Sequence, residues 1–276
     1  NTLPLQCKQL NKIVGSETFN GSLFLLPKDC RLTEFTLEGI SNIQGDFQCI
    51  DYFYVKEFVM PFIRVAGDMT IALNSGSINT AAEIEFPKLQ EIGGTLTLGT
   101  NRNANNITFP LLKKILGSCS VTTYKLKNDI EFTNLESIGT DGADAQIKFE
   151  IEATNILCPK LKTINGKFDI ATSSFMFDME VDKVSYPNVE SISENLSITC
   201  PYSDFGSNGI LSIDFSGLKS AKGISISGQG DVTDFSSFKY LFENNVLTGE
   251  SQWSVKECGY NPTFQEMKDG KYKLAE

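Results

Sequence analysis

The sequence predicts an all-β protein, a parallel β-helix (solenoid) in which short strands stack coil upon coil. One phrase recurs along the chain, and its clearest copy is Phe86-Pro87-Lys88-Leu89 followed by Ile92, Gly94 and Leu96. Positions that align with Pro87 fall at 38, 61, 87, 110, 133, 159, 187 and 216, so successive copies lie 23 to 29 residues apart. Such a regular period is typical of a repeat protein.

Each copy contains two segments in which apolar and polar residues alternate, as in a strand with one buried face. One segment precedes the proline, as in Ile84-Glu85-Phe86, and the other follows the glycine, as in Leu96-Thr97-Leu98. The proline predicts a corner between them, and the glycine predicts positive φ at the next corner. No copy leaves room for a helix of about 10–12 residues. We expect equivalent strands to pair in parallel, about 4.8 Å apart, with the residues before the prolines stacked in one internal ladder.

The repeat divides the chain into a core and two ends. We expect about eight or nine coils over residues 34–232, preceded by an N-terminal cap over residues 1–33. Residues 233–260 predict a C-terminal cap with a short helix that begins after Asp234 and has Phe238, Leu241 and Phe242 on one face. Trp253 lies later in this segment and should pack within the cap. Residues 261–276 are polar and predict a tail or linker to a stalk or anchor outside the chain.

The composition excludes several classes of function. The 276 residues include no histidine, so a Ser-His-Asp or Cys-His catalytic pair and a His-containing zinc site are excluded. The formal net charge of −10 argues against a nucleic-acid partner, whose phosphates need a basic surface. No apolar run is long enough to span a bilayer. We expect no cofactor, no metal site and no enzymatic activity.

Sequons and cysteines indicate the secretory route. Asn-x-Ser/Thr sequons predict N-glycosylation at Asn20, Asn106 and Asn195. The chain starts at Asn1 rather than Met, and we interpret it as a mature chain whose leader has been removed. The expected disulfides are Cys7–Cys30 and Cys200–Cys258. Cys119 and Cys158 replace apolar repeat residues and should be buried. The odd total of seven cysteines leaves at least one thiol, or a bond to another chain.

The phrase Phe-Pro-x-Leu-x-x-Ile-x-Gly-x-Leu-x-Ile resembles the receptor L-domain repeat, the leucine-rich-repeat-like β-helix of the insulin and EGF receptor ectodomains. It is more similar to the tandem units of fungal GPI-anchored cell-wall and sporulation proteins of the Ecm/Sps group. The resemblance covers roughly residues 34–262, with 7–33 as a first cap. The closing segment from Phe235 to Cys258 also looks like theirs, although Phe235 or a neighbour replaces the usual first cysteine.

The resemblance implies a right-handed β-helix of receptor L-domain type, which agrees with the right-handed crossover rule. It also implies an extracellular, GPI-anchored protein of the cell surface or cell wall. Its role would be wall or spore-wall organisation through structural or adhesive contacts, without catalytic residues.

The outward residues of the strands after the glycines form the candidate binding surface. They lie on a long, flat, mainly Ser- and Thr-bearing sheet: Thr70, Thr95, Thr97, Ser118, Ser120, Thr122, Lys148, Glu150, Lys167, Asp169, Ser197 and Ser225. This sheet could bind a cell-wall polysaccharide or another surface protein. Alternatively, it is a solvated surface on which Ser and Thr occur for their strand propensity. It offers almost no aromatic residues for stacking on sugars.

Two other sets of residues have a functional and a structural interpretation. Glu150, Glu152 and Asp169 would suit a retaining glycosidase, or they form a charge ladder with Lys148 and Lys167. Asp46 and Asp68 would face each other in successive coils, although a calcium site needs more oxygen ligands. The alternatives to a wall protein are therefore a receptor or adhesin module that binds a protein on its sheet face, and a polysaccharide-cleaving β-helix enzyme.

Overall fold

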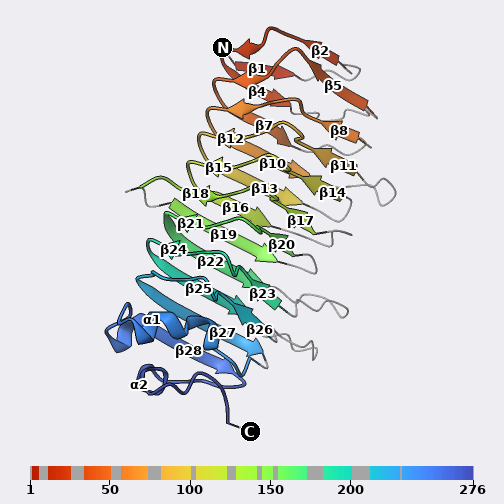
Figure 1. The fold of residues 1–276 in the computed structure, drawn as a ribbon. Helices are drawn as coiled ribbons and strands as arrows, with labels where there is room; N and C mark the ends of the chain where they lie inside the picture. The colour runs from red at the N-terminus through yellow and green to blue at the C-terminus, as the bar shows by residue number, and fades with distance from the viewer. Residues whose placement is uncertain are drawn as a thin grey trace.

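The computed structural model describes residues 2–5, 12–25, 34–50, 57–73, 82–100, 104–122, 129–141, 145–151, 155–172, 183–200, 212–230 and 232–275. Its core is a β-solenoid of stacked coils in which the paired strands run parallel, as the repeat predicted. Figure 1 shows the coils following one another from the N-terminus to a helix-bearing C-terminal end. Three sheets run along the stack, and we name them A, B and C.

Sheet A contains the strands that follow the repeat glycines, and it runs the full length of the solenoid. Its strand order is β1 (Thr2–Leu5), β4 (Ser22–Leu25), β7 (Phe47–Ile50), β10 (Met69–Leu73), β13 (Leu96–Thr100), β16 (Cys119–Thr122), β19 (Ala145–Ile151), β22 (Gly166–Thr172), β25 (Asn195–Cys200), β27 (Gly223–Gly230) and β28 (Trp253–Cys258).

Sheet B contains the strands that lead into the prolines. It comprises β2 (Lys12–Val14), β5 (Glu34–Glu38), β8 (Glu57–Val59), β11 (Ala82–Glu85), β14 (Ala104–Thr108), β17 (Ile130–Glu131) and β20 (Ile156–Leu157). The next two strands of this kind, β23 (Lys183–Ser185) and β26 (Ser212–Asp214), pair only with each other among the described strands. Sheet B is therefore interrupted between β20 and β23.

Sheet C was not predicted, because we interpreted the residues after each proline as a single corner. Its strands are two residues long: β3 (Thr18–Phe19), β6 (Asn42–Ile43), β9 (Arg64–Val65), β12 (Glu91–Ile92), β15 (Lys114–Ile115), β18 (Ser137–Ile138), β21 (Thr163–Ile164) and β24 (Ser191–Ile192). From β6 onward, each strand buries one Ile or Val. A strand of this length is too short to show alternation in the sequence.

The predicted ladder of residues before the prolines is confirmed. The rings of Phe86 and Phe109 stack with centroids 5.0 Å apart and 2° between their planes, and Phe132 continues the stack at 5.0 Å and 11°. Cys158 follows and is buried, as predicted. Tyr186 then returns the ladder to aromatic residues, and its ring packs 5.5 Å from that of Phe168 in sheet A.

Gly139 has the positive φ that we predicted for the repeat glycines, but the others in the central coils have a different role. Positive φ occurs among the described glycines at Gly39, Gly139, Gly228 and Gly270 only. At Gly94, by contrast, a Cβ atom would lie 2.7 Å from the carbonyl carbon of Gly67 in the preceding coil. The same close approach occurs at Gly117, 2.6 Å from the carbonyl carbon of Gly94. These glycines are needed because successive coils nearly touch there.

The N-terminal segment is part of the solenoid and not a separate cap over residues 1–33. Its strands β2, β3 and β4 lie in sheets B, C and A and pair with β5, β6 and β7. The repeat is hard to recognise there because these residues lack the Phe-Pro phrase.

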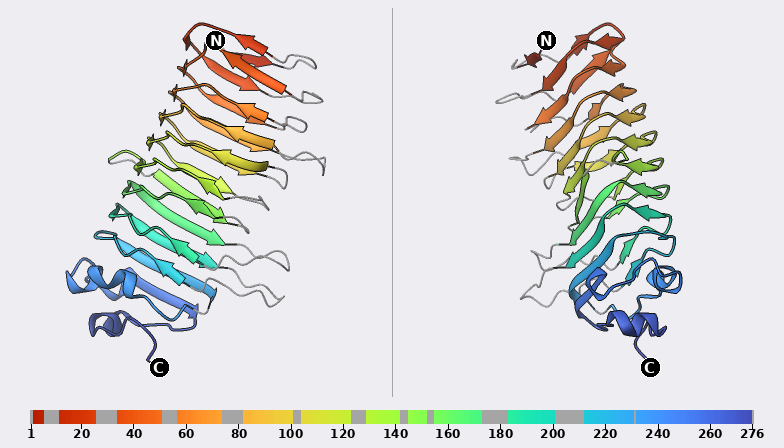
Figure 2. Two further views of the ribbon diagram at one scale, coloured as in Figure 1. Left: turned by 45° about the vertical axis from the view of Figure 1, so that its right-hand side comes forward. Right: turned by 90° about the vertical axis from the view of Figure 1, so that its left-hand side faces the viewer.

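The C-terminal cap contains the predicted helical segment. It comprises η1 (Ser236–Phe238) and α1 (Lys239–Glu243), and the Asp234 carboxylate accepts a hydrogen bond of 2.7 Å from the Ser236 N–H. After η2 (Glu250–Gln252), Trp253 packs on Phe242 with ring centroids 5.1 Å apart, which confirms its role in cap packing. Figure 2 shows the helices grouped at this end of the stack.

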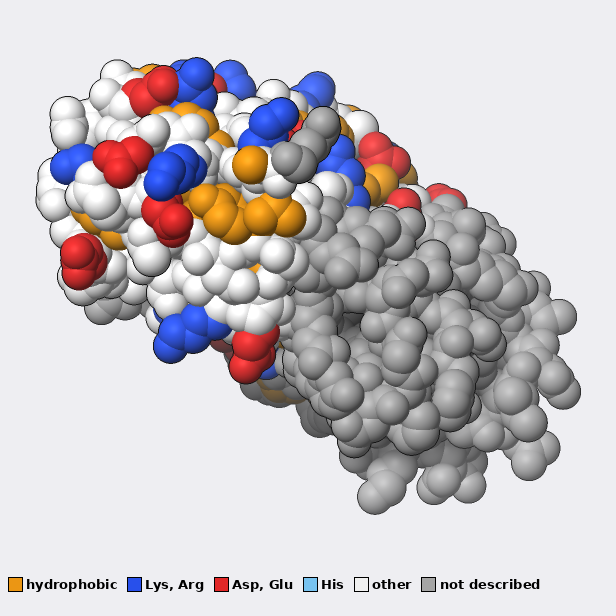
Figure 3. Space-filling model, turned by 90° about the horizontal axis from the view of Figure 1, so that it is seen from below, with side chains coloured by type: hydrophobic (Ala, Val, Ile, Leu, Met, Phe, Trp, Pro, Cys, Tyr) orange, Lys and Arg blue, Asp and Glu red, His pale blue; other side chains and the backbone are white. Residues whose placement is uncertain are grey.

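Residues 261–276 were expected to form a polar tail, but most of them belong to the cap. They contain α2 (Phe264–Lys268), which buries Phe264 and Met267. Thr263 and Glu266 form a capping box at its start, a local signal that the overall polarity of the segment obscured. Seen from this end, acidic and basic side chains are interspersed over the cap (Figure 3). Within the described ranges, no helix is long and apolar enough to cross a membrane.

Candidate functional site

The outward face of sheet A brings the predicted binding residues together. Register pairs align one row across the strands from β10 to β27: Thr70, Thr97, Ser120, Lys148, Asp169, Ser197 and Ser225. Two residues later in their strands, Thr122 pairs with Glu150. Thr95, Ser118 and Lys167 precede the first row by two residues. We call these three rows the polar face; the Glu150 side chain lies outside the described residues.

Side-chain oxygens beside this face accept hydrogen bonds from the backbone of the next coil. Asp46 Oδ1 accepts from the Asp68 N–H at 2.9 Å, and Asp68 Oδ1 accepts from the Thr95 N–H at 2.7 Å. Ser118 Oγ does the same for Gln146 at 3.0 Å. These bonds give Asp46 and Asp68 a role in coil stacking. Within the described segments, no cluster of three or more acidic or thiol side chains is arranged to hold a metal ion.

The charged residues of the polar face favour the charge-ladder interpretation. Lys167 Nζ lies 3.0 Å from Asp169 Oδ1, and the register places Lys148 directly opposite Asp169. Glu150 lies opposite Ala171, so Glu150 and Asp169, two of the three acidic residues considered for a glycosidase, are not directly opposite each other. Glu152 falls outside the described residues. Asp169 therefore has a basic neighbour on its own strand and another on the adjacent strand.

A second charge ladder, which the sequence analysis missed, follows the corner between sheets B and C. Its charges alternate in sign through Lys113, Glu136, Lys162, Glu190 and Lys219. The backbone N–H of each residue from Glu136 onward donates to the carbonyl of the preceding member at 2.8 to 3.0 Å. All five stand three residues after the proline-aligned position, so alignment of the repeats on their prolines would have shown the pattern.

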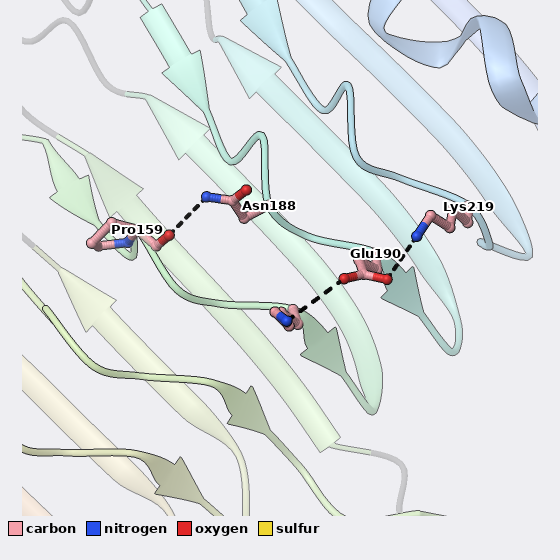
Figure 4. A network of polar contacts seen from close by, with 5 residues as sticks. Pro159, Asn188, Glu190 and Lys219 are labelled. Atoms are coloured by element: carbon pink, nitrogen blue, oxygen red, sulfur yellow. Dashed lines mark hydrogen bonds and ion pairs between the residues drawn. The ribbon is translucent and has the colours of Figure 1, made fainter.

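Glu190 forms ion pairs with both of its neighbours in this ladder (Figure 4). Lys219 Nζ lies 2.8 Å from Glu190 Oε2, and Lys162 Nζ lies 4.0 Å from Glu190 Oε1. The hydrogen bond and charge of Lys219 lower the pKa of the Glu190 carboxyl, and the same pair raises the pKa of Lys219. The Asn188 amide donates to the Pro159 carbonyl at 2.8 Å nearby. The ladder thus links consecutive coils outside the sheets.

A groove lies at the C-terminal end of the polar face. This groove of about 390 Å³ is lined by β22, β25, β27, η2 and β28, and its polar lining includes Asn195, Ser197, Ser225, Gln252 and Ser254. A smaller pocket of about 120 Å³ lies where sheet B is interrupted, between β20 and β23. In this pocket the Tyr186 hydroxyl donates to the Ile156 carbonyl at 3.0 Å.

The predicted glycosylation sites differ in their surroundings. Asn20 is exposed between β3 and β4, and Asn195 is exposed at the start of β25, within the groove. The side chain of Asn106 lies outside the described residues, so this site stays a prediction.

The predicted disulfides also stay predictions. Cys7, Cys30 and the Cys200 side chain lie outside the described residues, and Cys258 ends β28. Cys49, Cys119 and Cys158 are buried, and burial raises the pKa of each thiol. These three thiols therefore stay protonated and unreactive at neutral pH.

With this geometry established, comparison of the chain with protein-family models, curated proteins and solved structures finds no match.

Proposed function

We propose that the protein is a non-enzymatic, extracellular surface protein whose polar face makes structural or adhesive contacts in a cell wall. The observation that carries this proposal is the alignment of small hydroxyl-bearing side chains across successive strands of sheet A. Each strand repeats the arrangement about 4.8 Å further along the stack, so an extended ligand would meet the same chemistry many times.

The repeat phrase supports the finer part of the proposal. The phrase resembles the repeat of the receptor L domain and of fungal GPI-anchored wall and sporulation proteins. We therefore propose a right-handed solenoid of eight to nine coils, held at the cell surface by a lipid anchor outside the 276 residues. The three sequons suit an extracellular location.

The test is co-sedimentation of the purified chain with insoluble β-glucan, chitin and mannan. The double substitution Thr97→Arg and Ser120→Arg places two long charged side chains on the polar face. We expect it to abolish binding. The matched control is Glu131→Arg on sheet B, which changes the net charge by the same amount and should bind like the parent. Equal binding by all three proteins, or release of reducing sugar by the parent, would contradict the proposal.

A protein ligand is the second candidate, and one observation favours it. Among the described outward residues of sheet A, only Phe24 is aromatic, and it lies in β4, outside the polar face. The polar face therefore lacks the stacking platform that sugar-binding surfaces usually offer. A photoreactive amino acid at Ser120 would then cross-link a surface protein on intact cells, whereas the same group at Glu131 would not. Cross-linking from both positions would argue against a specific face.

A further inference from the structure

Asn195 occupies a distinctive position on the polar face. It is exposed at the start of β25, and its neighbour in the next strand of sheet A is Gly223. A Cβ atom at Gly223 would lie 3.0 Å from Asn195 Oδ1. The missing side chain at Gly223 therefore opens the groove directly beside the Asn195 amide.

A row of hydroxyl groups lies next to this amide. Ser197, Ser225 and Ser254 are aligned across β25, β27 and β28, and all three line the groove. No hydrogen bond or ion pair within the described chain involves their hydroxyls. The row can therefore donate to and accept from the hydroxyl groups of a sugar.

Gln252 and the two lysines of the groove already have partners within the chain. Gln252 Oε1 accepts from the Gly249 N–H at 3.0 Å, and Gln252 Nε2 donates to the Lys222 carbonyl at 2.9 Å. Lys222 pairs with Glu194, and Lys167 pairs with Asp169. Because both lysines are neutralised, the groove suits a neutral, hydroxyl-rich ligand better than an anion.

We propose that Asn195 carries an N-linked glycan whose first sugars lie in this groove, along the row of serines. Asn195 begins a sequon completed by Ser197, which is the acceptor pattern for glycan transfer. In that transfer the Asn195 amide nitrogen loses a proton and bonds to the anomeric carbon of a lipid-diphosphate-linked oligosaccharide. The anomeric carbon–oxygen bond breaks, and the lipid diphosphate leaves with the electron pair. The inference rests on the secretory route of the proposed function.

A glycan in this groove would restrict the part of the polar face that is available for contacts. It would cover the C-terminal strands around β25, β27 and β28. The rows from Thr70 to Lys148 would stay accessible, and they contain the positions Thr97 and Ser120 chosen for the binding test.

The first experiment is glycopeptide mapping of the chain secreted by a eukaryotic host. We expect a glycan at Asn195 that is lost in Asn195→Gln, whereas an unmodified Asn195 in the secreted protein would overturn the inference. The co-sedimentation assay on the same preparation separates the two proposals, because wall binding by a chain without this glycan leaves the proposed function standing.

The second experiment tests whether the sugars lie in the groove. We expect peptide-N-glycosidase to release the Asn195 glycan at least tenfold more slowly from the folded than from the denatured protein. Ser225→Arg fills the groove and should accelerate release from the folded protein. Thr97→Arg, which lies outside the groove on the same face, should not. Equally rapid release from the folded parent and from Ser225→Arg would contradict docking, and thermal melting checks that each variant is folded.

Discussion

Gly94 stands where two coils come closest, and it allows a direct test of the glycine interpretation. In Gly94→Ala, the new methyl group would lie 2.7 Å from the carbonyl carbon of Gly67. We expect the free energy of unfolding in urea to fall by about 1–3 kcal/mol, the usual cost of overpacking. Gly99→Ala is the control, because nothing lies within 4 Å of its added methyl group. It should be neutral or stabilising by about 0.4–1 kcal/mol, and equal losses in both variants would refute the interpretation.

Individual residues also show where sequence reasoning succeeds and where it fails. Thr97 and Ser120 were placed on one face correctly because strand alternation alone determines their side. The predicted reason for a glycine at position 94 was wrong. The residue is glycine because the neighbouring coil lies so close, and a contact with another coil cannot be deduced from the local sequence. The groove beside Asn195 was not predicted, since Gly223 and Ser254 become neighbours of this sequon only through pairing between strands.

At the scale of one element, the charge ladder offers a test of how coils are kept in register. In Glu190→Lys, three lysines would follow one another at positions 162, 190 and 219. We expect a lower melting temperature at low salt, and a smaller difference at high salt because the repulsion is screened. Reversing the other four members as well, with Lys113→Glu, Glu136→Lys, Lys162→Glu and Lys219→Glu, restores the alternation and should recover the melting temperature.

The control for the ladder is Glu131→Lys, an exposed substitution on sheet B. Within the described part of the chain, Glu131 makes no ion pair. The Glu131→Lys variant should therefore have a melting temperature close to that of the parent at every salt concentration. A comparable loss of melting temperature in this control would attribute the effect to net charge instead of the ladder.

Helix α2 is the second element that makes a sharp prediction. Met267 is fully buried in the cap, and truncation of a buried Met to Ala typically costs about 2–5 kcal/mol. We therefore expect Met267→Ala to lower the free energy of unfolding in urea by an amount in this range. Gln265→Ala, on the exposed side of the same helix, should change it by less than about 0.5 kcal/mol. An unaffected Met267→Ala would mean that residues 261–276 are the tail that the sequence predicted.

These elements show which parts of the fold are visible in a sequence. The strands of sheets A and B were predictable because several residues alternate in each copy. The two-residue strands of sheet C and the single turn and a half of α2 contain too few residues for a periodic signal. Only alignment of many copies, or a capping box such as Thr263 with Glu266, could have revealed them.

At the scale of the whole molecule, a buried tyrosine hydroxyl and three buried thiols predict that the protein becomes less stable at alkaline pH. Burial raises the pKa of Tyr186 and of the thiols of Cys49, Cys119 and Cys158. The unfolded chain releases these protons above about pH 8.5–10, whereas the folded protein retains them. These groups should therefore make their full contribution to the free energy of unfolding below this pH range, and that contribution should be lost as the pH rises through it.

Tyr186→Phe isolates one contribution to this pH dependence. The variant leaves the Ile156 carbonyl without the tyrosine hydroxyl, so we expect a loss of about 1–3 kcal/mol at pH 7. Above pH 10 its free energy of unfolding should fall less steeply than that of the parent in urea titrations. The exposed Tyr240→Phe is the control and should follow the parent. Identical pH dependence in all three proteins would exclude a contribution from Tyr186.

The interruption of sheet B has a mechanical consequence. Between the coils that contain β20 and β23, sheets A and C continue, while in the described chain sheet B contributes only the bond from Tyr186 to Ile156. Under tension, stacked coils separate most easily where the fewest hydrogen bonds join one coil to the next. Among the coils from β2 to β24, where all other neighbours are joined by three sheets, a solenoid pulled at its two ends should therefore part first at this boundary, leaving two blocks that each retain their own coils. For a protein anchored in a wall, such a boundary would act as an extensible joint between two stiff segments.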